Sequence, residues 1–158
     1  MARKALFIPL GISDSHIFAM DTTLSPADSA DSYEARMIKH FNNQVCRFDL
    51  ILLGLGDNAH TASLFPHTTV LHETTALIKA IYIEEVKMYR ITFTAPLINM
   101  AHNVVFLVYG AGKAEAVHYI LEDPTNIEEY PAQLIHPEGG ELNWFMDEAA
   151  AERIMKRN

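Results

Sequence analysis

The segment that most constrains the fold runs from residue 48 to residue 66 and reads FDLILLGLGDNAHTASLFP. It opens with consecutive apolar residues, Leu50 to Leu53, as is typical of a strand buried on both faces of a parallel sheet. Gly54 and Gly56 follow, where the chain can turn tightly and bring backbone N–H groups close to a ligand. Ligands of open α/β sheets bind beyond the carboxyl ends of the strands. We therefore expect His60, which follows this turn, to lie at a functional site.

The same segment resembles the signature of the 6-phosphogluconolactonase family, which reads approximately LGxGxDGHTASLFP. The matching residues are Leu53 to Pro66, LGLGDNAHTASLFP. The related sugar-phosphate isomerases and deaminases share the glycines, but after their histidine they read more like IAFNEP. The tail TASLFP therefore favours the lactonase branch. Two positions depart from the family pattern, because Asn58 replaces the usual Asp and Ala59 replaces the usual Gly.

The resemblance implies that His60 is a general base and that Asn58 orients it. An amide can hold an imidazole by hydrogen bonding, but it cannot stabilise an imidazolium as a carboxylate does. In a serine-protease triad this exchange costs about 10⁴-fold in turnover. The cost is smaller if His60 acts alone on water or if Asp57 takes over the role. The alternative for His60 is a structural histidine satisfied by the backbone.

A short helix is expected to start near Thr61, directly after His60. The positive end of its dipole would favour the neutral imidazole, which is the form that acts as a base. Backbone N–H groups around Gly54 and Gly56 would then be available to the substrate or to a developing oxyanion.

A second buried strand, residues 103–109, enters a turn that reads Gly-Ala-Gly-Lys and then a helix over residues 114–121. The turn is not a Walker A loop, because the spacing GxxxxGK[ST] is absent. Backbone N–H groups and the helix dipole make such a terminus an anion site, and Lys113 adds a point charge. In the resembled family a lysine at this position contacts the substrate phosphate. The alternative is a solvated surface lysine.

Arg90 is a second candidate for the phosphate. It opens a family-like RIT-T pattern within an expected strand over residues 88–95, where apolar and polar residues alternate. Its alternative roles are an ordinary residue of the polar face or a structural ion pair. The predicted substrate-binding residues are therefore Gly54, Gly56, Asp57, Arg90 and Lys113.

Strands near residues 48, 77, 89, 104 and 142 alternate with helical segments, which predicts an α/β fold with a mainly parallel sheet. The resemblance implies the three-layer fold of the lactonases and sugar-phosphate isomerases. The remaining expected elements are a helix from Ser25, its N-cap, to about Gln44, strands over 76–83 and 141–146, a helix over 96–102, and a closing helix over 148–157 capped by Asp147.

The length of 158 residues indicates one domain. Met1 to Leu6 matches the second half of a family segment of the type SNxxMARxALL, and residues 1–12 are expected to be the end of a helix that runs into a loop. That segment lies well inside the family's chains. Residues 1–158 are therefore expected to form an incomplete domain, the C-terminal two thirds of the family domain.

Composition and residue spacing argue against several classes of partner, namely nucleic acid, membranes and metal ions. The formal net charge of −8 argues against nucleic acid, which requires clustered Lys and Arg. No apolar stretch approaches the roughly 20 residues of a membrane span. Cys46 is the only cysteine, so no internal disulfide can form, and a reducing cytoplasm fits best. His60, His67 and His72 match no zinc spacing, so no metal site is expected.

The implied reaction is hydrolysis of 6-phospho-D-glucono-1,5-lactone to 6-phosphogluconate in the oxidative pentose phosphate pathway, with no metal or organic cofactor. One alternative is a sugar-phosphate isomerase or deaminase on the same fold. Another is a non-catalytic protein that binds sugar phosphates, which the shorter chain and Asn58 both favour. An uncovered sheet edge or apolar face would also allow this chain to form homo-oligomers.

Overall fold

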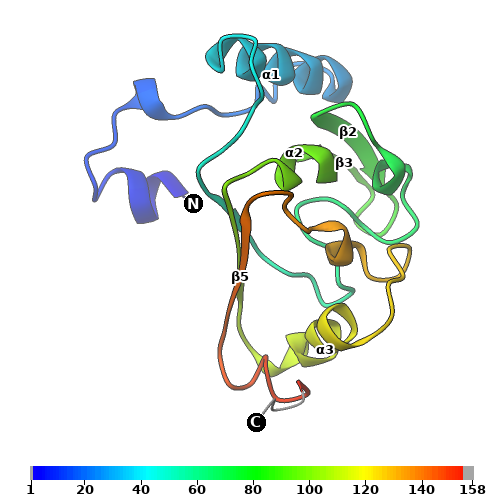
Figure 1. The fold of residues 1–158 in the computed structure, drawn as a ribbon. Coiled ribbons are helices and arrows are strands. Elements are labelled where there is room, and N and C mark those ends of the chain that lie inside the picture. Colours follow the sequence, from blue (N-terminus) through cyan, green and yellow to red (C-terminus); the bar gives the residue numbers. More distant parts are fainter. Residues whose placement is uncertain (1, 155–158) are drawn as a thin grey trace.

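The computed structural model describes residues 2–154 (Figure 1). Short turns of 3₁₀ or π helix lie at Arg3–Phe7, Asp14–His16, Thr69–His72, Ala111–Lys113 and Pro131–Leu134. The helices and strands are α1 Pro26–His40, β1 Ile51–Leu53, β2 Ile78–Ile83, β3 Met88–Phe93, α2 Ala95–Asn99, β4 Asn103–Val108, α3 Ala114–Glu122 and β5 Glu141–Met146.

The strands form two sheets. One is parallel, with the order β1-β4-β5, and pairs Ile51 with Val104 and Val104 with Leu142. The other is the antiparallel hairpin of β2 and β3. The predicted α/β fold with a mainly parallel sheet is confirmed. Each predicted strand is present, although β1 is much shorter than the expected run from residue 48 to 54.

The core lies on one face of the parallel sheet. Ile51, Val104 and Phe106 project into it and are buried. The ring of Phe106 stacks on Trp144 of β5 with centroids 4.0 Å apart. In Figure 1 the sheet runs along one side of the molecule, with α2 and α3 on the same side of it. A second cluster joins α1 to the hairpin through Ala30 and other buried residues.

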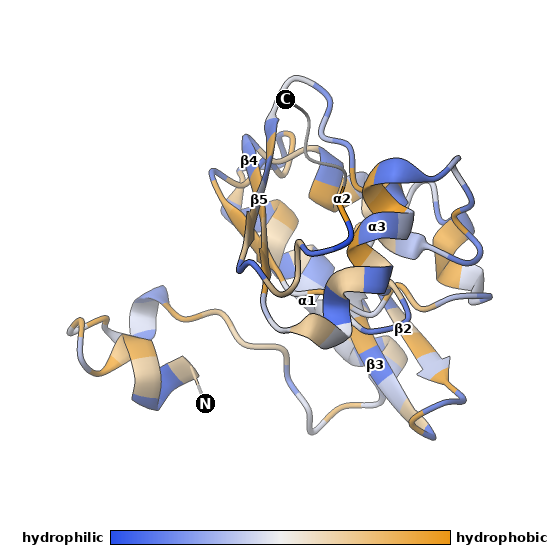
Figure 2. Ribbon diagram, turned by 90° about the horizontal axis from the view of Figure 1, so that it is seen from below, coloured by the Kyte–Doolittle hydropathy of each residue, from blue (hydrophilic) through white to orange (hydrophobic). Residues whose placement is uncertain are grey.

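The opposite face of the sheet is exposed. Leu52, Leu107 and Phe145 alternate with the inward-facing residues, and their exposed fractions are 59%, 49% and 63%. The first part of the segment that precedes α1, residues 2–16, stands away from the rest of the molecule in both Figure 1 and Figure 2, and it also exposes apolar side chains such as Ile8. The described residues therefore cover only one face of the parallel sheet.

Helix α1 begins as its sequence predicts. The Ser25 hydroxyl accepts the Asp28 N–H at 3.2 Å and donates to the Asp28 carboxylate at 2.6 Å, with Pro26 in the first turn. The helix ends at His40, a few residues before the expected end. Asn42 and Asn43 both adopt positive φ, a conformation that an α-helix cannot continue.

The helix expected near Thr61 is not formed, so that prediction was wrong. Thr61 instead makes an isolated antiparallel bridge with Leu64, and the Leu64 N–H donates to the Thr61 carbonyl at 2.9 Å. Ala62 between them has a φ of 50°. A left-handed residue at this point turns the chain back on itself, and His60 therefore receives no helix dipole.

The closing helix was also predicted wrongly within the described residues. Asp147 does cap a turn, because its carboxylate accepts the Ala150 N–H at 2.8 Å, but residues 148–154 form turns only. The same carboxylate accepts the Gly110 N–H, which ties this turn to the end of β4. Helices this short are marginal without an extensive buried face. Residues 155–157 of the expected helix lie outside the described residues.

Candidate active site

The loop that carries His60 is tied to the end of β1. The Thr61 hydroxyl donates to the Gly54 carbonyl at 2.8 Å, and Thr61 is only 1% exposed. The Gly56 N–H donates to the His60 carbonyl at 2.8 Å. These two bonds hold the backbone of the loop at the carboxyl end of the strand.

The imidazole of His60 is fixed by three neighbours. Its Nδ1 lies 2.5 Å from Oδ1 of Asn58, and its ring stacks on the buried ring of Phe65 with centroids 3.8 Å apart. The ring also lies against Gly56, where an added Cβ would overlap the imidazole. Glycine is therefore required at position 56 by close approach rather than by a turn. Because an amide oxygen only accepts, Nδ1 carries the proton and Nε2 is unprotonated in the neutral ring.

Burial lowers the pKa of His60 below its usual value of 6.5. Opposing this, the nearby negative charge of Glu85 raises the same pKa, while the positive charge of Lys113 lowers it further. The imidazole is therefore mainly neutral at pH 7 and can accept a proton. The neutral imidazole was predicted from the sequence, but its cause is burial and not a helix dipole.

His60 and Lys113 line one cleft of about 450 Å³, together with Gly54, Leu55, Gly56, Thr61 and Ala62. That volume lies within the range of ordinary small-molecule sites. Lys113 comes from the turn before α3, and its ammonium group forms an ion pair with the Asp57 carboxylate. The two chain segments that were predicted to supply a base and an anion-binding group therefore meet at the same edge of the sheet.

Asp57 contacts Lys113 and not His60. The pairing with Lys113 lowers the pKa of the Asp57 carboxyl below its usual range. Asp57 thus does not take over the orienting role that the family assigns to the next position, since Asn58 makes that contact itself. Its carboxylate holds the ammonium group of Lys113 near the cleft.

Of the predicted substrate-binding residues, Gly56 does not have the expected role, and the role of Arg90 stays a prediction. The Gly56 N–H is not available to an oxyanion, because it already donates to the His60 carbonyl. Arg90 is exposed on β3, opposite Ile81 of β2, and does not line the cleft. Its charge does contribute to lowering the pKa of His60. Its contact with a phosphate remains a prediction.

Three residues that shape the site, Thr61, Phe65 and Glu85, were not among the predicted site residues. Thr61 and Phe65 belong to the recognised motif, so their positions carried a signal, although their contacts with Gly54 and His60 did not. Glu85 lies in the turn between β2 and β3, where its carboxylate accepts a hydrogen bond from Asn58 Nδ2 at 3.0 Å. No sequence pattern links residues 58 and 85.

The other histidines considered for a metal lie beside glutamates. His72 Nε2 lies 2.8 Å from a Glu128 oxygen, and His67 Nε2 lies 3.3 Å from Glu129. Among residues 2–154, no three His, Cys, Asp or Glu side chains are grouped so as to hold a metal ion. Over the same residues, no helix has the length and apolar character needed to cross a membrane.

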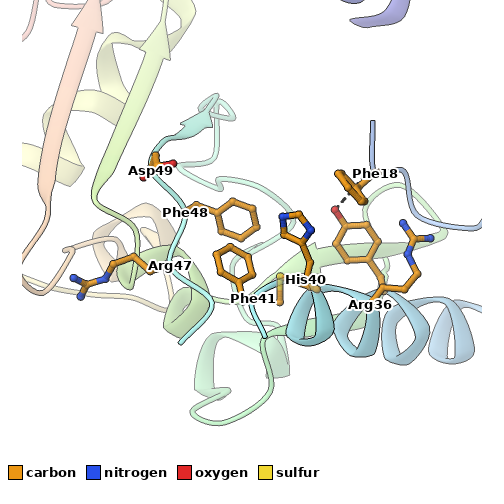
Figure 3. A pocket seen from close by; sticks show the side chains of 9 residues that line it. Phe18, Arg36, His40, Phe41, Arg47, Phe48 and Asp49 are labelled. Carbon is orange, nitrogen blue, oxygen red and sulfur yellow. Dashed lines mark hydrogen bonds between the residues drawn. The ribbon is translucent and has the colours of Figure 1, made fainter. Parts of the chain in front are cut away.

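A second cavity, of about 420 Å³, lies between α1 and the segment that leads into β1 (Figure 3). Its walls are largely aromatic, and the rings of Phe41 and Phe48 meet edge to face with centroids 5.4 Å apart. The Tyr33 hydroxyl donates to the Phe18 carbonyl, and the Arg36 guanidinium lies over the Tyr33 ring. None of the predicted site residues lines this cavity, and we assign its side chains a packing role.

The fold and the cleft define an α/β protein in which a mainly neutral histidine and a lysine line one cleft beyond the carboxyl ends of parallel strands. Residues 1–144 match the family model for glucosamine-6-phosphate isomerases/6-phosphogluconolactonase. The chain belongs to this family. The predicted resemblance is thereby confirmed.

Individual relatives agree with this assignment. The chain is 42% identical to a 6-phosphogluconolactonase from Synechocystis sp., over 98% of this chain and 65% of the relative. It superposes on the crystal structure of the devB protein with a TM-score of 0.87 at 32% identity, over 97% of this chain and 65% of that one. It superposes on the 6-phosphogluconolactonase from Trypanosoma cruzi with a TM-score of 0.82 at 25% identity, again over 65% of that chain. The chain thus spans about 65% of the length of these relatives.

Proposed function

We propose that the protein hydrolyses 6-phospho-D-glucono-1,5-lactone to 6-phosphogluconate. The observation that carries the proposal is the shared cleft, which is lined by both His60, whose Nδ1 is held by Asn58, and Lys113. Several relatives bear the name 6-phosphogluconolactonase, which supports the lactone as substrate. The sequence TASLFP after His60 supports the lactonase over the isomerase branch.

In the proposed reaction, Nε2 of His60 accepts a proton from a water molecule as the water oxygen attacks the lactone carbonyl. The resulting tetrahedral intermediate collapses with cleavage of the bond to the ring oxygen. The imidazolium returns its proton to that oxygen, which becomes the hydroxyl of the open sugar acid. General base catalysis of this kind contributes typically about 10²- to 10⁴-fold. The Nδ1 proton stays on His60 throughout, hydrogen-bonded to Oδ1 of Asn58.

Lys113 binds the phosphate at the far end of the sugar. In the free protein its ammonium group is paired with Asp57, which is largely exposed. Because solvent screens this ion pair, the phosphate can bind the ammonium group beside the Asp57 carboxylate or in its place. Fixing the phosphate converts binding energy into positioning of the lactone carbonyl against the base. Arg90, whose charge already acts on His60, would add a second positive charge.

The direct test is the rate of lactone opening above the spontaneous rate, measured by proton release with the wild type and with His60→Ala. We expect a catalysed excess in the wild type, lowered by at least about 10²-fold in the variant. For the 158 residues alone we expect weak turnover, because they span about 65% of the relatives' length. Equal excess rates for the two proteins would remove His60 from the mechanism. Release of ammonia from an amino-sugar phosphate would instead indicate the isomerase or deaminase reaction.

The exposed sheet face supports a proposal about assembly. Leu107 lies opposite Phe145, and Leu52 lies opposite Val105, two residues before Leu107 on the same face. Leu52, Leu107 and Phe145 thus form a diagonal apolar row on the exposed face, and exposed apolar patches are uncommon on surfaces that stay in water. We propose that two copies of this chain associate through this face.

We also propose a cytoplasmic location. It rests on the single cysteine, Cys46, which is buried and reduced.

A further inference from the structure

Asn58 lies between two side chains that bond to opposite ends of its amide. Oδ1 lies 2.5 Å from Nδ1 of His60, and Nδ2 donates to Oε2 of Glu85 at 3.0 Å. The three side chains thus form a continuous hydrogen-bonded series from an exposed carboxylate to the imidazole. Glu85 reaches Asn58 because the turn from Glu84 to Lys87 carries it beyond the end of the hairpin, with Lys87 at a φ of 49°.

The tautomer of His60 depends on how this amide is turned. A carboxylate at position 58 could only accept, so Nδ1 of a neutral imidazole would have to carry the proton. An amide offers an acceptor at one end and a donor at the other. If the amide of Asn58 were reversed, its NH₂ group would face Nδ1, and the proton would have to sit on Nε2. A ring protonated on Nε2 cannot accept a proton from water there.

Two contacts favour the observed orientation of the amide. The His60 N–H donates to Oδ1 of Asn58, but at 3.4 Å this bond is long. The carboxylate of Glu85 only accepts, so it bonds the NH₂ end and would be repelled by the oxygen of a reversed amide. Glu85 therefore supplies the shorter and charge-assisted contact.

We propose that Glu85 is a positioning residue that keeps the proton of His60 on Nδ1 by acting through Asn58. The inference rests on the proposed function only in giving the free Nε2 the role of base. It explains how an amide can stand where the family has a carboxylate, since Glu85 provides the missing negative charge one hydrogen bond further out. The other charged groups that act on His60 are Lys113, Asp57 and Arg90.

The test reads the tautomer directly, from the ¹⁵N shifts of the His60 imidazole in the labelled 158-residue protein. It is done at about pH 8, where the ring is neutral. The informative variant is Glu85→Lys, because an ammonium group only donates and so turns the oxygen of Asn58 toward itself. We expect Nδ1–H in the wild type and a predominance of Nε2–H in Glu85→Lys. Glu84→Lys is the matched control, since Glu84 is also exposed in the turn, and it should keep Nδ1–H.

A second substitution isolates the role of the amide. Adding Asn58→Asp to Glu85→Lys should restore Nδ1–H, because a carboxylate cannot donate to the ring whatever stands at position 85. Glu85 is exposed, so charge reversal there should leave the fold intact, which the amide spectrum checks. The inference is overturned if Glu85→Lys and Glu84→Lys show the same tautomer, or if the double variant stays protonated on Nε2.

Turnover separates this inference from the proposed function. If the lactone is hydrolysed, Glu85→Lys should lower kcat by about tenfold or more, with recovery in the double variant. A tautomer that switches without any lactone hydrolysis supports the positioning role and contradicts the proposed reaction. Lactone hydrolysis together with an unchanged tautomer in Glu85→Lys supports the proposed reaction and contradicts the positioning role of Glu85.

Discussion

His60 owes its chemical state to residues that lie close in the sequence and to one that does not. Asn58, Gly56 and Phe65 all belong to the segment that the sequence singles out, and they fix the ring's hydrogen bond, its approach to the backbone and its stacking. These positions could be found from the sequence because they lie together in one motif. Glu85 could not be found, because its contact with Asn58 is created by the hairpin turn.

The lowered pKa of His60 predicts the pH dependence of catalysis. The base must be unprotonated, so kcat/KM should rise with pH through a pKa below 6.5 and be level at neutral pH. The measurement is a pH–rate profile corrected for spontaneous lactone opening. An acid limb centred above 6.5 would contradict the burial of the imidazole as the dominant effect.

At the scale of elements, the features that depend on local sequence could be predicted, whereas the pairing of strands far apart in the chain could not. Helix α1 follows from its cap and its buried face, and each predicted strand is present in β1 to β5. The alternation that predicts β2 and β3 does not say that they pair only with each other, since sheet membership depends on contacts far apart in the chain. The helix expected near Thr61 fails because a left-handed Ala62 reverses the chain, which composition does not reveal.

Glu73 stabilises the entry into β2 through hydrogen bonds from three consecutive backbone N–H groups. One carboxylate oxygen accepts the N–H groups of Thr74, Thr75 and Ala76 at 2.9 to 3.0 Å. These backbone bonds, those from Ala76 and Thr75 foremost, lower the pKa of Glu73 from 4.5 to about 2. The ionised form is therefore favoured in the folded state.

From the lowered pKa of Glu73 we predict that this side chain makes the free energy of unfolding depend on pH. Its contribution should be complete above pH 4.5, where Glu73 is ionised in both states, and should be lost as pH falls from 4.5 toward 2. Urea unfolding at a series of pH values should show a shallower acid loss for Glu73→Gln than for the wild type. Glu84→Gln serves as the control, and an equal acid loss in all three proteins would contradict the assignment.

At the scale of the whole molecule, the parallel sheet has one buried and one exposed face. Leu52, Leu107 and Phe145 lie on the exposed face, whereas Val104 and Phe106 fill the core. The period of two along the strands predicts such alternation, but the nearly continuous apolar run of β4 predicts burial on both faces. The exposed apolar row is therefore a surface suited to association.

Self-association through this face should depend on its apolar side chains. Light scattering of the wild type should give a mass that rises with concentration toward twice the 17.8 kDa of one chain. Leu107→Lys lies at the centre of the row and should shift the equilibrium strongly toward the monomer, because a charge would be buried in the contact. Glu84→Lys, which introduces the same side chain in the exposed turn between β2 and β3, is the control. A wild type that stays monomeric at all concentrations would contradict the proposal.

The central claim is that His60 and Lys113 face one sugar phosphate. Titration with 6-phosphogluconate, followed by NMR of the His60 imidazole, tests it without requiring turnover. We expect the ¹⁵N signals of His60 to shift and saturate in the wild type, and the Kd to rise by about tenfold or more in Lys113→Ala, as for loss of a charged hydrogen bond. Saturable binding that leaves His60 unshifted, or a Kd unchanged by Lys113→Ala, would contradict it.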